Sequence, residues 1–281
     1  MEGVTRAGLS ACVVRDAEAH AETDRIIAKV HSAAYERELE EAVRMGSRYF
    51  HSMDNPMSAA TFAAARMAVA TSLTAAQEML ESKRSFVIAR PPGHHAERLS
   101  AMGFCFFNTI ACVAEWLREQ PGIERVFIYD FDVHHGNGTQ HLFEQRDDVY
   151  YASIHRYPFY PGTGAANEIG AGAGRGFTKN IPVSAGQGDT AFLRATEDEI
   201  VRAIDDYRPN AILLSSGFDA HRRDPLGGMK VTEQAYGEIT RRVVECAEKW
   251  SEGRVLSLLE GGYDLEGIAA SVSEHVNALN T

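Results

Sequence analysis

The sequence predicts an α/β fold with one central, mostly parallel sheet flanked by helices. Short apolar runs alternate with amphipathic segments of helical period from residue 86 to the C-terminus. These runs lack the polar alternation of half-exposed strands, which is typical of parallel strands buried on both faces. The chain has 281 residues, 44% of them apolar and 24% charged, as in globular proteins. No linker or internal repeat interrupts the pattern, so we expect one catalytic domain over residues 1–281.

The elements follow one another in an order that suits repeated strand–helix units. Residues 24–45 carry apolar side chains at helical spacing, a polar loop follows at 51–56, and residues 58–81 form an alanine-rich helix. Strands are predicted at 86–89, 126–129, 149–154, 211–215 and 255–259, and helices at 108–119, 190–207, 232–248 and 266–279. Thr190 and Thr232 are candidate N-caps. The glycine-rich residues 162–176 are expected to form a surface loop.

Charge and cysteine usage exclude some classes of protein. The net charge is −11, whereas a nucleic-acid-binding surface needs a basic stripe. The sequence has neither an apolar run of about 18 residues nor a basic–apolar leader, so we expect a soluble cytoplasmic protein without a membrane partner. The four cysteines, Cys12, Cys105, Cys112 and Cys246, lack paired spacing and are expected to be free thiols.

Residues that carry chemistry follow five predicted strands. Ligands of open parallel sheets bind beyond the carboxyl ends of the strands, where these residues would meet. The segments concerned are Arg90-Pro-Pro-Gly-His94-His95, Asp130-Phe-Asp132-Val-His134-His135-Gly-Asn137, His155, Gly217-Phe-Asp219 with Asp224, and Glu260-Gly-Gly-Tyr263. The sequence therefore predicts one site at this edge of the sheet.

The segment Asp130-x-Asp132-x-His134 indicates a metal site. Alternate residues of a strand point the same way, so these side chains would line up as the strand ends. A mixture of carboxylate and imidazole suits zinc or ferrous iron. Asp132 and His134 would supply two ligands and Asp224 the third. The alternative is that these acids cap helices or pair with Arg222 and Arg223.

Paired histidines and a tyrosine complete a hydrolytic set. His94 and His95 follow a rigid Pro-Pro-Gly turn, and metal-dependent hydrolysis needs a base for the attacking water and an acid for the leaving amine. Tyr263 follows two glycines, and its hydroxyl suits a donor to a carbonyl oxygen that gains negative charge. The structural alternatives are that His94 and His95 are surface residues and that the Tyr263 ring is packed in the core.

Taken together, these motifs resemble the zinc-dependent histone deacetylase superfamily, which includes bacterial acetylpolyamine amidohydrolases and histone deacetylase-like amidohydrolases. The resemblance extends from about residue 26 to the C-terminus, and the Arg-Pro-Pro-Gly opening with Asn137 is similar to the class II branch. It implies an arginase/deacetylase-like fold. The matching segments are Arg90–Ala96, Gly103-Phe-Cys-Phe-Phe-Asn108, Asp130–Thr139, Tyr160-Pro-Gly-Thr-Gly164, Gly217-Phe-Asp219 with Asp224-Pro, and Glu260-Gly-Gly-Tyr263.

The resemblance implies roles for individual residues. One zinc ion would be bound by Asp132, His134 and Asp224. His95 would be the general base and acid, oriented by Asn137, and His94 its electrostatic partner, held by Asp130. Tyr263 would polarise the scissile carbonyl. Gly103, Phe104, Tyr160 and Gly262 would line a tunnel for the acylated side chain, and Asp54 would orient the substrate at its rim. A structural potassium ion is implied at Asp130, Asp132, His134, Ser153 and Ile154.

The expected function is therefore deacylation of an acylated amine, either a peptide acyl-lysine or an acylpolyamine. Relatives usually carry an extra N-terminal strand and loop before the helix near Asp24, so the chain is expected to be N-terminally shortened. Two alternatives remain: a binding protein of the same fold with weakened catalysis, and an arginase-like ureohydrolase. The latter uses an Asp-x-His-x-Asp strand end, whereas this chain has Asp130-x-Asp132-x-His134. Homo-oligomer formation is left open.

Overall fold

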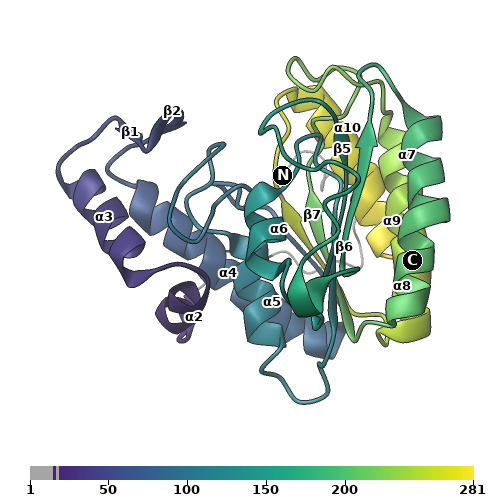
Figure 1. Cartoon of the computed structure of the whole chain (residues 1–281), viewed down its shortest axis with the longest axis horizontal. Coiled ribbons are helices and arrows are strands. Elements are labelled where there is room, and N and C mark those ends of the chain that lie inside the picture. The colour runs from purple at the N-terminus through teal and green to yellow at the C-terminus, as the bar shows by residue number, and fades with distance from the viewer. Residues whose placement is uncertain (1–14, 17–18) are drawn as a thin grey trace.

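The computed structural model describes residues 15–16 and 19–281, and its centre is a six-stranded sheet (Figure 1). All neighbouring strands of this sheet run parallel, in the order β3-β8-β7-β4-β5-β6. Their bounds are β3 Arg84–Val87, β8 Val255–Leu259, β7 Ala211–Ser216, β4 Val126–Asp130, β5 Val149–Arg156 and β6 Thr178–Val183. The predicted parallel sheet is confirmed.

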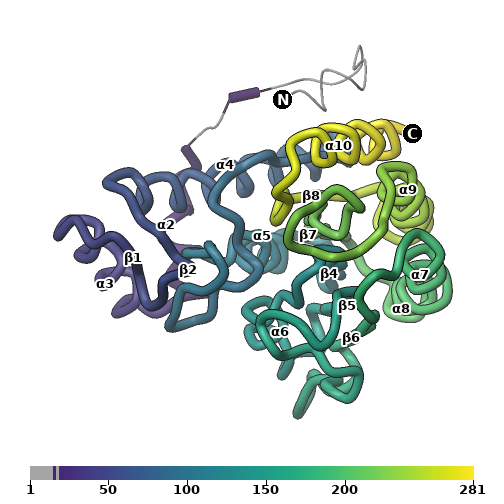
Figure 2. The backbone as a smooth tube through the Cα atoms, turned by 90° about the horizontal axis from the view of Figure 1, so that it is seen from above, coloured from purple at the N-terminus to yellow at the C-terminus, as the bar shows by residue number. Residues whose placement is uncertain are grey.

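Helices cover both faces of the sheet (Figure 2). One side carries α2 Thr23–Val30, α3 Ala33–Arg44, α4 Thr61–Ser82, α5 Thr109–Leu117 and α6 Asn137–Phe143. The other side carries α7 Asp189–Ala195, the π-helical turn η2 Thr196–Val201, α8 Arg202–Tyr207, α9 Glu233–Trp250 and α10 Leu265–Leu279. A short 3-10 turn, η1 Gly172–Gly174, lies in the loop between β5 and β6.

Successive residues of the central strand enter two separate cores. Val126 and Ile128 pack among the helices of the α4–α5 side, whereas Phe127 and Tyr129 pack among those of the α9 side. This alternation is the period of two that a strand imposes on its side chains. Because both faces are covered by apolar helices, every residue of β4 is buried, and the strand reads as a continuous apolar run.

Four elements differ from the sequence prediction. The helix expected over residues 24–45 is divided at His31 and Ser32, where Ser32 caps α3 by accepting the N–H of Tyr35. The loop expected at 51–56 lies within a hairpin of β1 Tyr49–Phe50 and β2 Ser52–Pro56. Strand β6 and the short helix α6 were not predicted. β6 begins within a polar stretch, and α6 begins among the glycines around Asn137.

The two proposed N-caps behave differently. Thr232 is the N-cap residue of α9, but its hydroxyl donates to Asp189 and makes no cap hydrogen bond. Thr190 is already inside α7, because that helix begins at Asp189 after Gly188, and the prediction there is wrong. Side-chain caps come instead from Asn108 at α5 and Asp264 at α10.

Cys105, Cys112 and Cys246 are buried free thiols, as expected, and Cys12 lies outside the described residues. Within residues 15–16 and 19–281, no helix has both the length and the apolar character needed to span a membrane.

Candidate active site

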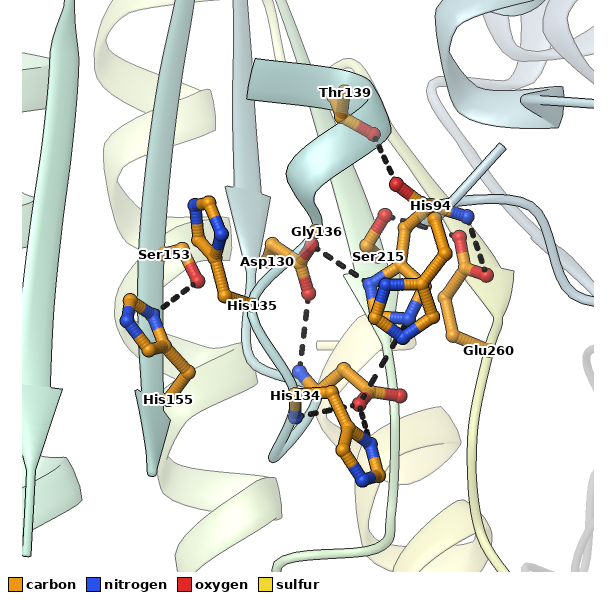
Figure 3. Close-up of polar contacts among 12 residues, drawn as sticks. His94, Asp130, His134, His135, Gly136, Thr139, Ser153, His155, Ser215 and Glu260 are labelled. Atoms are coloured by element: carbon orange, nitrogen blue, oxygen red, sulfur yellow. Dashed lines mark hydrogen bonds and ion pairs between the residues drawn. The ribbon is translucent and has the colours of Figure 1, made fainter. Parts of the chain in front are cut away.

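The strand order brings the predicted chemical residues together at one edge of the sheet. β3 leads into the loop with His94 and His95, β8 into Glu260 and Tyr263, β7 into Asp219, and β4 ends at Asp130. These four strands are consecutive in the sheet, so their carboxyl ends are adjacent although their residues are far apart in the sequence. In Figure 3, Asp130 and Glu260 lie on either side of His94, and the His134 ring lies below them.

Three side chains form a compact group able to hold a metal ion. Donor atoms of Asp132, His134 and Asp219 all lie within 4.8 Å of one another. His134 Nδ1 is 3.0 Å from Asp132 Oδ1 and 3.1 Å from Asp219 Oδ2. Zinc–ligand bonds of about 2.0–2.2 Å at near-tetrahedral angles place ligand atoms roughly 3.3 Å apart. The group therefore has the size and the donor types of a zinc site.

The charge and shape of this group also fit a cation. Asp219 Oδ2 is buried and accepts no hydrogen bond, whereas Asp219 Oδ1 accepts the N–H of Val133 at 2.8 Å. Burial and the neighbouring Asp132 raise the pKa of Asp219 to about 7. A Cβ at Gly217 would overlap the Asp132 carboxylate, and one at Gly261 would overlap both carboxylates. Two carboxylates held this closely need a positive charge between them.

Asp224, which we expected to complete this group, lies outside it, and the carboxylate in that place is Asp219. Asp224 Oδ1 accepts the N–H groups of Leu226 and Gly227, and Asp224 Oδ2 accepts the N–H of Tyr263 at 2.8 Å. Its oxygens are thus used to fold the loop after β7 and to hold the backbone of Tyr263. Asp219 lies three residues beyond the end of β7, whereas Asp224 lies eight beyond it.

The alignment of Asp130, Asp132 and His134 along one strand face was also not accurate. β4 ends at Asp130, and each aspartate then accepts the backbone N–H two residues further on, Asp132 N at 3.2 Å and His134 N at 2.9 Å. These side-chain turns redirect the chain. Asp130 consequently faces His94, and Asp132 and His134 face Asp219.

His94 is a buried imidazole surrounded by carboxylates. Its Nδ1 lies 3.1 Å from Asp130 Oδ2, and its Nε2 lies 3.9 Å from Asp132 Oδ1. Burial alone would lower the pKa of His94, but Asp132, Asp130 and Glu260 outweigh burial and raise it to about 10. His94 is therefore a fixed positive charge beside the metal group at neutral pH.

His95 has the opposite electrostatic environment. Its ring lies 4.0 Å from that of His94 and 5.9 Å from that of His134, centre to centre. Burial and the charges of these two histidines lower the pKa of His95 well below its ordinary value. His95 Nδ1 lies 2.7 Å from Asn137 Oδ1, and a neutral amide oxygen stabilises the imidazolium less than a carboxylate does. His95 is therefore unprotonated at neutral pH and able to act as a base.

Glu260 supports the histidine loop, a role that we did not predict. Its Oε2 accepts the N–H of Gly93 at 2.7 Å and that of His94 at 3.2 Å, and its Oε1 accepts the Ser215 hydroxyl at 3.1 Å (Figure 3). Burial raises the pKa of Glu260 to about 7. Its place directly after β8 was visible in the sequence, but its backbone partners were not.

The residues expected to bind substrate lie close to His95 and Tyr263. Asp54 Oδ2 accepts the Tyr160 hydroxyl at 2.6 Å and the N–H of Gly103 at 3.2 Å. The Tyr160 ring is 5.3 Å from His95, and the Phe104 ring is 6.2 Å from Tyr263. Tyr263 is half-buried, and burial with the charges of nearby carboxylates raises the pKa of its hydroxyl. These contacts place Asp54, Gly103, Phe104 and Tyr160 in one group beside His95 and Tyr263.

Glycines in this wall meet specific backbone requirements. Gly103 has φ of 54°, and a Cβ there would overlap the His95 ring. Gly262 has φ of 142°, and a Cβ there would lie 2.9 Å from Ile268 Cγ1. Phe104 adopts φ of 68° without being glycine, and its N–H is held by Asn55 Oδ1 at 2.9 Å. Such backbone strain is typical of functional sites.

The residues implied for potassium lie at the ends of two paired strands. Asp130 of β4 stands opposite Ser153 of β5, and Ile154 follows Ser153. Asp130 Oδ2 accepts the Tyr151 hydroxyl at 3.2 Å, and the Ser153 hydroxyl bonds to His155 Nδ1 at 2.9 Å. Potassium binding there stays a prediction.

A parallel α/β sheet with a carboxylate–histidine group at its strand ends is typical of a metal-binding α/β protein. Comparison with known proteins gives the family. The chain matches the family model for the histone deacetylase domain over residues 2–279, a range that begins before the motifs noted above. It therefore belongs to the histone deacetylase family.

Individual relatives agree with this assignment. A probable deacetylase of Archaeoglobus fulgidus is 39% identical over 243 residues, covering 86% of this chain and 67% of that protein. Histone deacetylase 9 of Homo sapiens is 43% identical over 227 residues, covering 77% of this chain and 22% of that protein. The crystal structure of the HDA15 HD domain superposes with a TM-score of 0.91 at 34% identity, covering 99% of this chain and 79% of that one.

Proposed function

We propose that the protein is a zinc-dependent amide hydrolase that removes an acyl group from an acylated amine, of the acetyl-lysine or acetylpolyamine type. The observation that supports this most directly is the neutral, Asn137-oriented His95 beside the group of Asp132, His134 and Asp219. A base and a metal-ligating group in contact are the minimum that hydrolysis of an unactivated amide requires.

Zinc would be held by Asp132, His134 and Asp219. Two anionic ligands and one neutral ligand suit a divalent ion and leave a coordination position free. When bound, the ion would polarise the scissile carbonyl and lower the pKa of the attacking water. A potassium ion near Asp130 and Ser153 would be structural.

The two histidines have different roles, proton transfer for His95 and charge stabilisation for His94. His95 takes the proton of the attacking water on Nε2, because its Nδ1–H donates to Asn137, and later passes that proton to the leaving amine. His94 keeps its charge through Asp130 and stabilises the negative charge that develops next to it.

The remaining residues bind and polarise the substrate. The Tyr263 hydroxyl donates to the carbonyl oxygen as it becomes an oxyanion, and Asp224 positions Tyr263 through its backbone N–H. Asp54 receives an N–H group of the substrate at the rim, where Gly103 and Tyr160 already bond to its Oδ2. Phe104 and Tyr160 flank the aliphatic part of the acylated amine.

The proposal is tested by amine release from the zinc-loaded protein. Acetyl-lysine peptides are compared with acetylputrescine and acetylspermidine, and His95→Ala serves as the control with the metal site intact. We expect release by the parent protein and almost none by His95→Ala. Stoichiometric zinc without release from any of these substrates would contradict the proposal and favour a binding protein of the same fold.

A further inference from the structure

The side chain of Asn137 lies between His95 and a carboxylate that the proposed mechanism does not use. Asn137 Oδ1 is 2.7 Å from His95 Nδ1, and Asn137 Nδ2 is 2.6 Å from Glu97 Oε1. We propose that Glu97 is a positioning residue that acts through Asn137 and determines which ring nitrogen of His95 is free to accept a proton. This inference rests on the proposed function, in which His95 is the base.

The orientation of the Asn137 amide follows from its neighbours. An ionised carboxylate only accepts hydrogen bonds, so the NH₂ group of Asn137 must face Glu97. The other neighbours of Nδ2 are also acceptors, the carbonyl oxygen of His95 at 3.3 Å and Met102 Sδ at 3.6 Å. Oδ1 therefore faces His95. Because Oδ1 can only accept, His95 carries its proton on Nδ1, and the lone pair on Nε2 is left free.

The opposite orientation is unfavourable at both ends of the amide. It would place Oδ1 against the Glu97 carboxylate and the NH₂ group against His95 Nδ1, which would then have to lose its proton. The proton of neutral His95 would move to Nε2, the atom that has to act as the base. A hydrogen bond to a charged acceptor is about twice as strong as one between neutral groups, so Glu97 has the largest influence on this choice.

Glu97 is itself held independently of Asn137. Its Oε1 also lies 2.8 Å from Nδ1 of His141, and its backbone N–H donates to the carbonyl oxygen of Ser100 at 2.9 Å. The buried His31 accepts the N–H of Asn108 on Nε2, so its Nδ1–H donates to the carbonyl oxygen of Glu97 at 2.9 Å. The backbone of residue 97 is thus fixed by groups that its side chain does not touch.

Solvent exposure increases from Asn137 through Glu97 to His141. Asn137 is buried, whereas the side chain of Glu97 is 24% exposed and that of His141 is 42% exposed. Glu97 and His141 line a surface cavity of about 270 Å³. A side chain in this place can be replaced without opening the protein core.

The first part of the test is kinetic and uses the zinc-loaded protein. Glu97→Met keeps the length of the side chain and removes the acceptor, and Glu97→Gln keeps an acceptor oxygen. We expect Glu97→Met to lower kcat about tenfold with KM within about twofold of the parent, and Glu97→Gln to stay within about threefold in kcat. Glu144→Met is the matched control, because it removes a half-buried carboxylate at the end of α6, near His141, and is expected to keep the parent kcat.

The second part of the test determines by NMR which ring nitrogen of His95 carries the proton. Long-range ¹H–¹⁵N spectra of His95 at neutral pH distinguish a protonated Nδ1 from a protonated Nε2, whether or not a substrate is turned over. We expect a protonated Nδ1 in the parent and in Glu144→Met, and a substantial Nε2–H population in Glu97→Met. If Glu97→Met does not fold, Glu97→Ser is measured in the same way.

Two outcomes would overturn the inference. One is parent-like kcat in Glu97→Met; the other is an unchanged His95 spectrum in a folded Glu97 variant that lacks the acceptor. A third outcome would contradict the proposed function alone. In it the parent protein is inactive, its His95 is protonated on Nδ1, and the proton moves partly to Nε2 in Glu97→Met. The two failures are therefore distinguishable.

Discussion

Replacing the buried His275 by glutamine is expected to remove part of the protein's loss of stability in acid. His275 Nδ1 lies 2.6 Å from Thr240 Oγ1, and His275 Nε2 lies 2.8 Å from Ser257 Oγ. The Thr240 hydroxyl donates to the carbonyl oxygen of Tyr236, so it accepts the Nδ1–H of His275. The neutral imidazole is thus satisfied by hydroxyl groups, and burial lowers the pKa of His275 to about 3.

The sign and size of the effect follow from proton linkage. The ordinary pKa of an unfolded histidine is about 6.5, so the unfolded chain binds a proton below this pH while folded His275 does not. Stability is therefore lost as pH falls from about 6.5 toward 3. At pH 5, about 1.5 units below 6.5, the loss is about 2 kcal/mol at roughly 1.4 kcal/mol per unit. Burial also lowers the pKa of His31 and of His155 to about 4. These two histidines add a loss of stability in acid that is the same in the parent and in His275→Gln.

The assay is urea unfolding of the parent and His275→Gln at pH 8 and pH 5. The pH 8 comparison measures the cost of the altered packing and hydrogen bonds, since His275 is then neutral in both states. We expect the parent to lose about 2 kcal/mol more than the variant between the two pH values. Any pH dependence of metal binding is common to both and cancels. Equal losses in the two proteins would refute the assignment of a buried, neutral His275.

Three further predictions concern the site. Asp219→Asn should abolish stoichiometric zinc binding, whereas Asp224→Asn should retain zinc, and metal analysis that gave the reverse result would restore Asp224 as the ligand. Tyr263→Phe keeps the ring and removes one donor to the oxyanion, so kcat should fall about 10²–10³-fold with zinc content and unfolding unchanged; an active variant would limit Tyr263 to packing. Asn137→Asp places a carboxylate on His95, raises the pKa of its imidazole and should move the acidic limb of the pH–rate profile to higher pH, which an unmoved limb at full zinc occupancy would contradict.

The order of strands and helices was largely predictable from local patterns. β4, β7 and β8 were found within a residue of their bounds because strands buried on both faces are short, uninterrupted apolar runs. The pairing of His95 with Asn137 and of His94 with Asp130 was also expected, on the basis of the family resemblance, and both contacts are present. β6 was missed because it is the edge strand and carries Lys179 and Asn180, which apolar patterning does not recognise.

Local sequence patterns predict a parallel α/β fold whose strand ends carry carboxylates, histidines and a tyrosine, because hydrophobic period and motif spacing are local properties. Which of the two aspartates after β7 meets His134 depends on tertiary contacts, since both lie in the same loop and the local sequence favours neither. Asp224 accepts three backbone N–H groups, whereas Asp219 Oδ2 is buried, accepts no hydrogen bond and lies beside His134. The orientation of Asn137 was likewise set by Glu97, 40 residues earlier, through a hydrogen bond that forms only when the chain is folded.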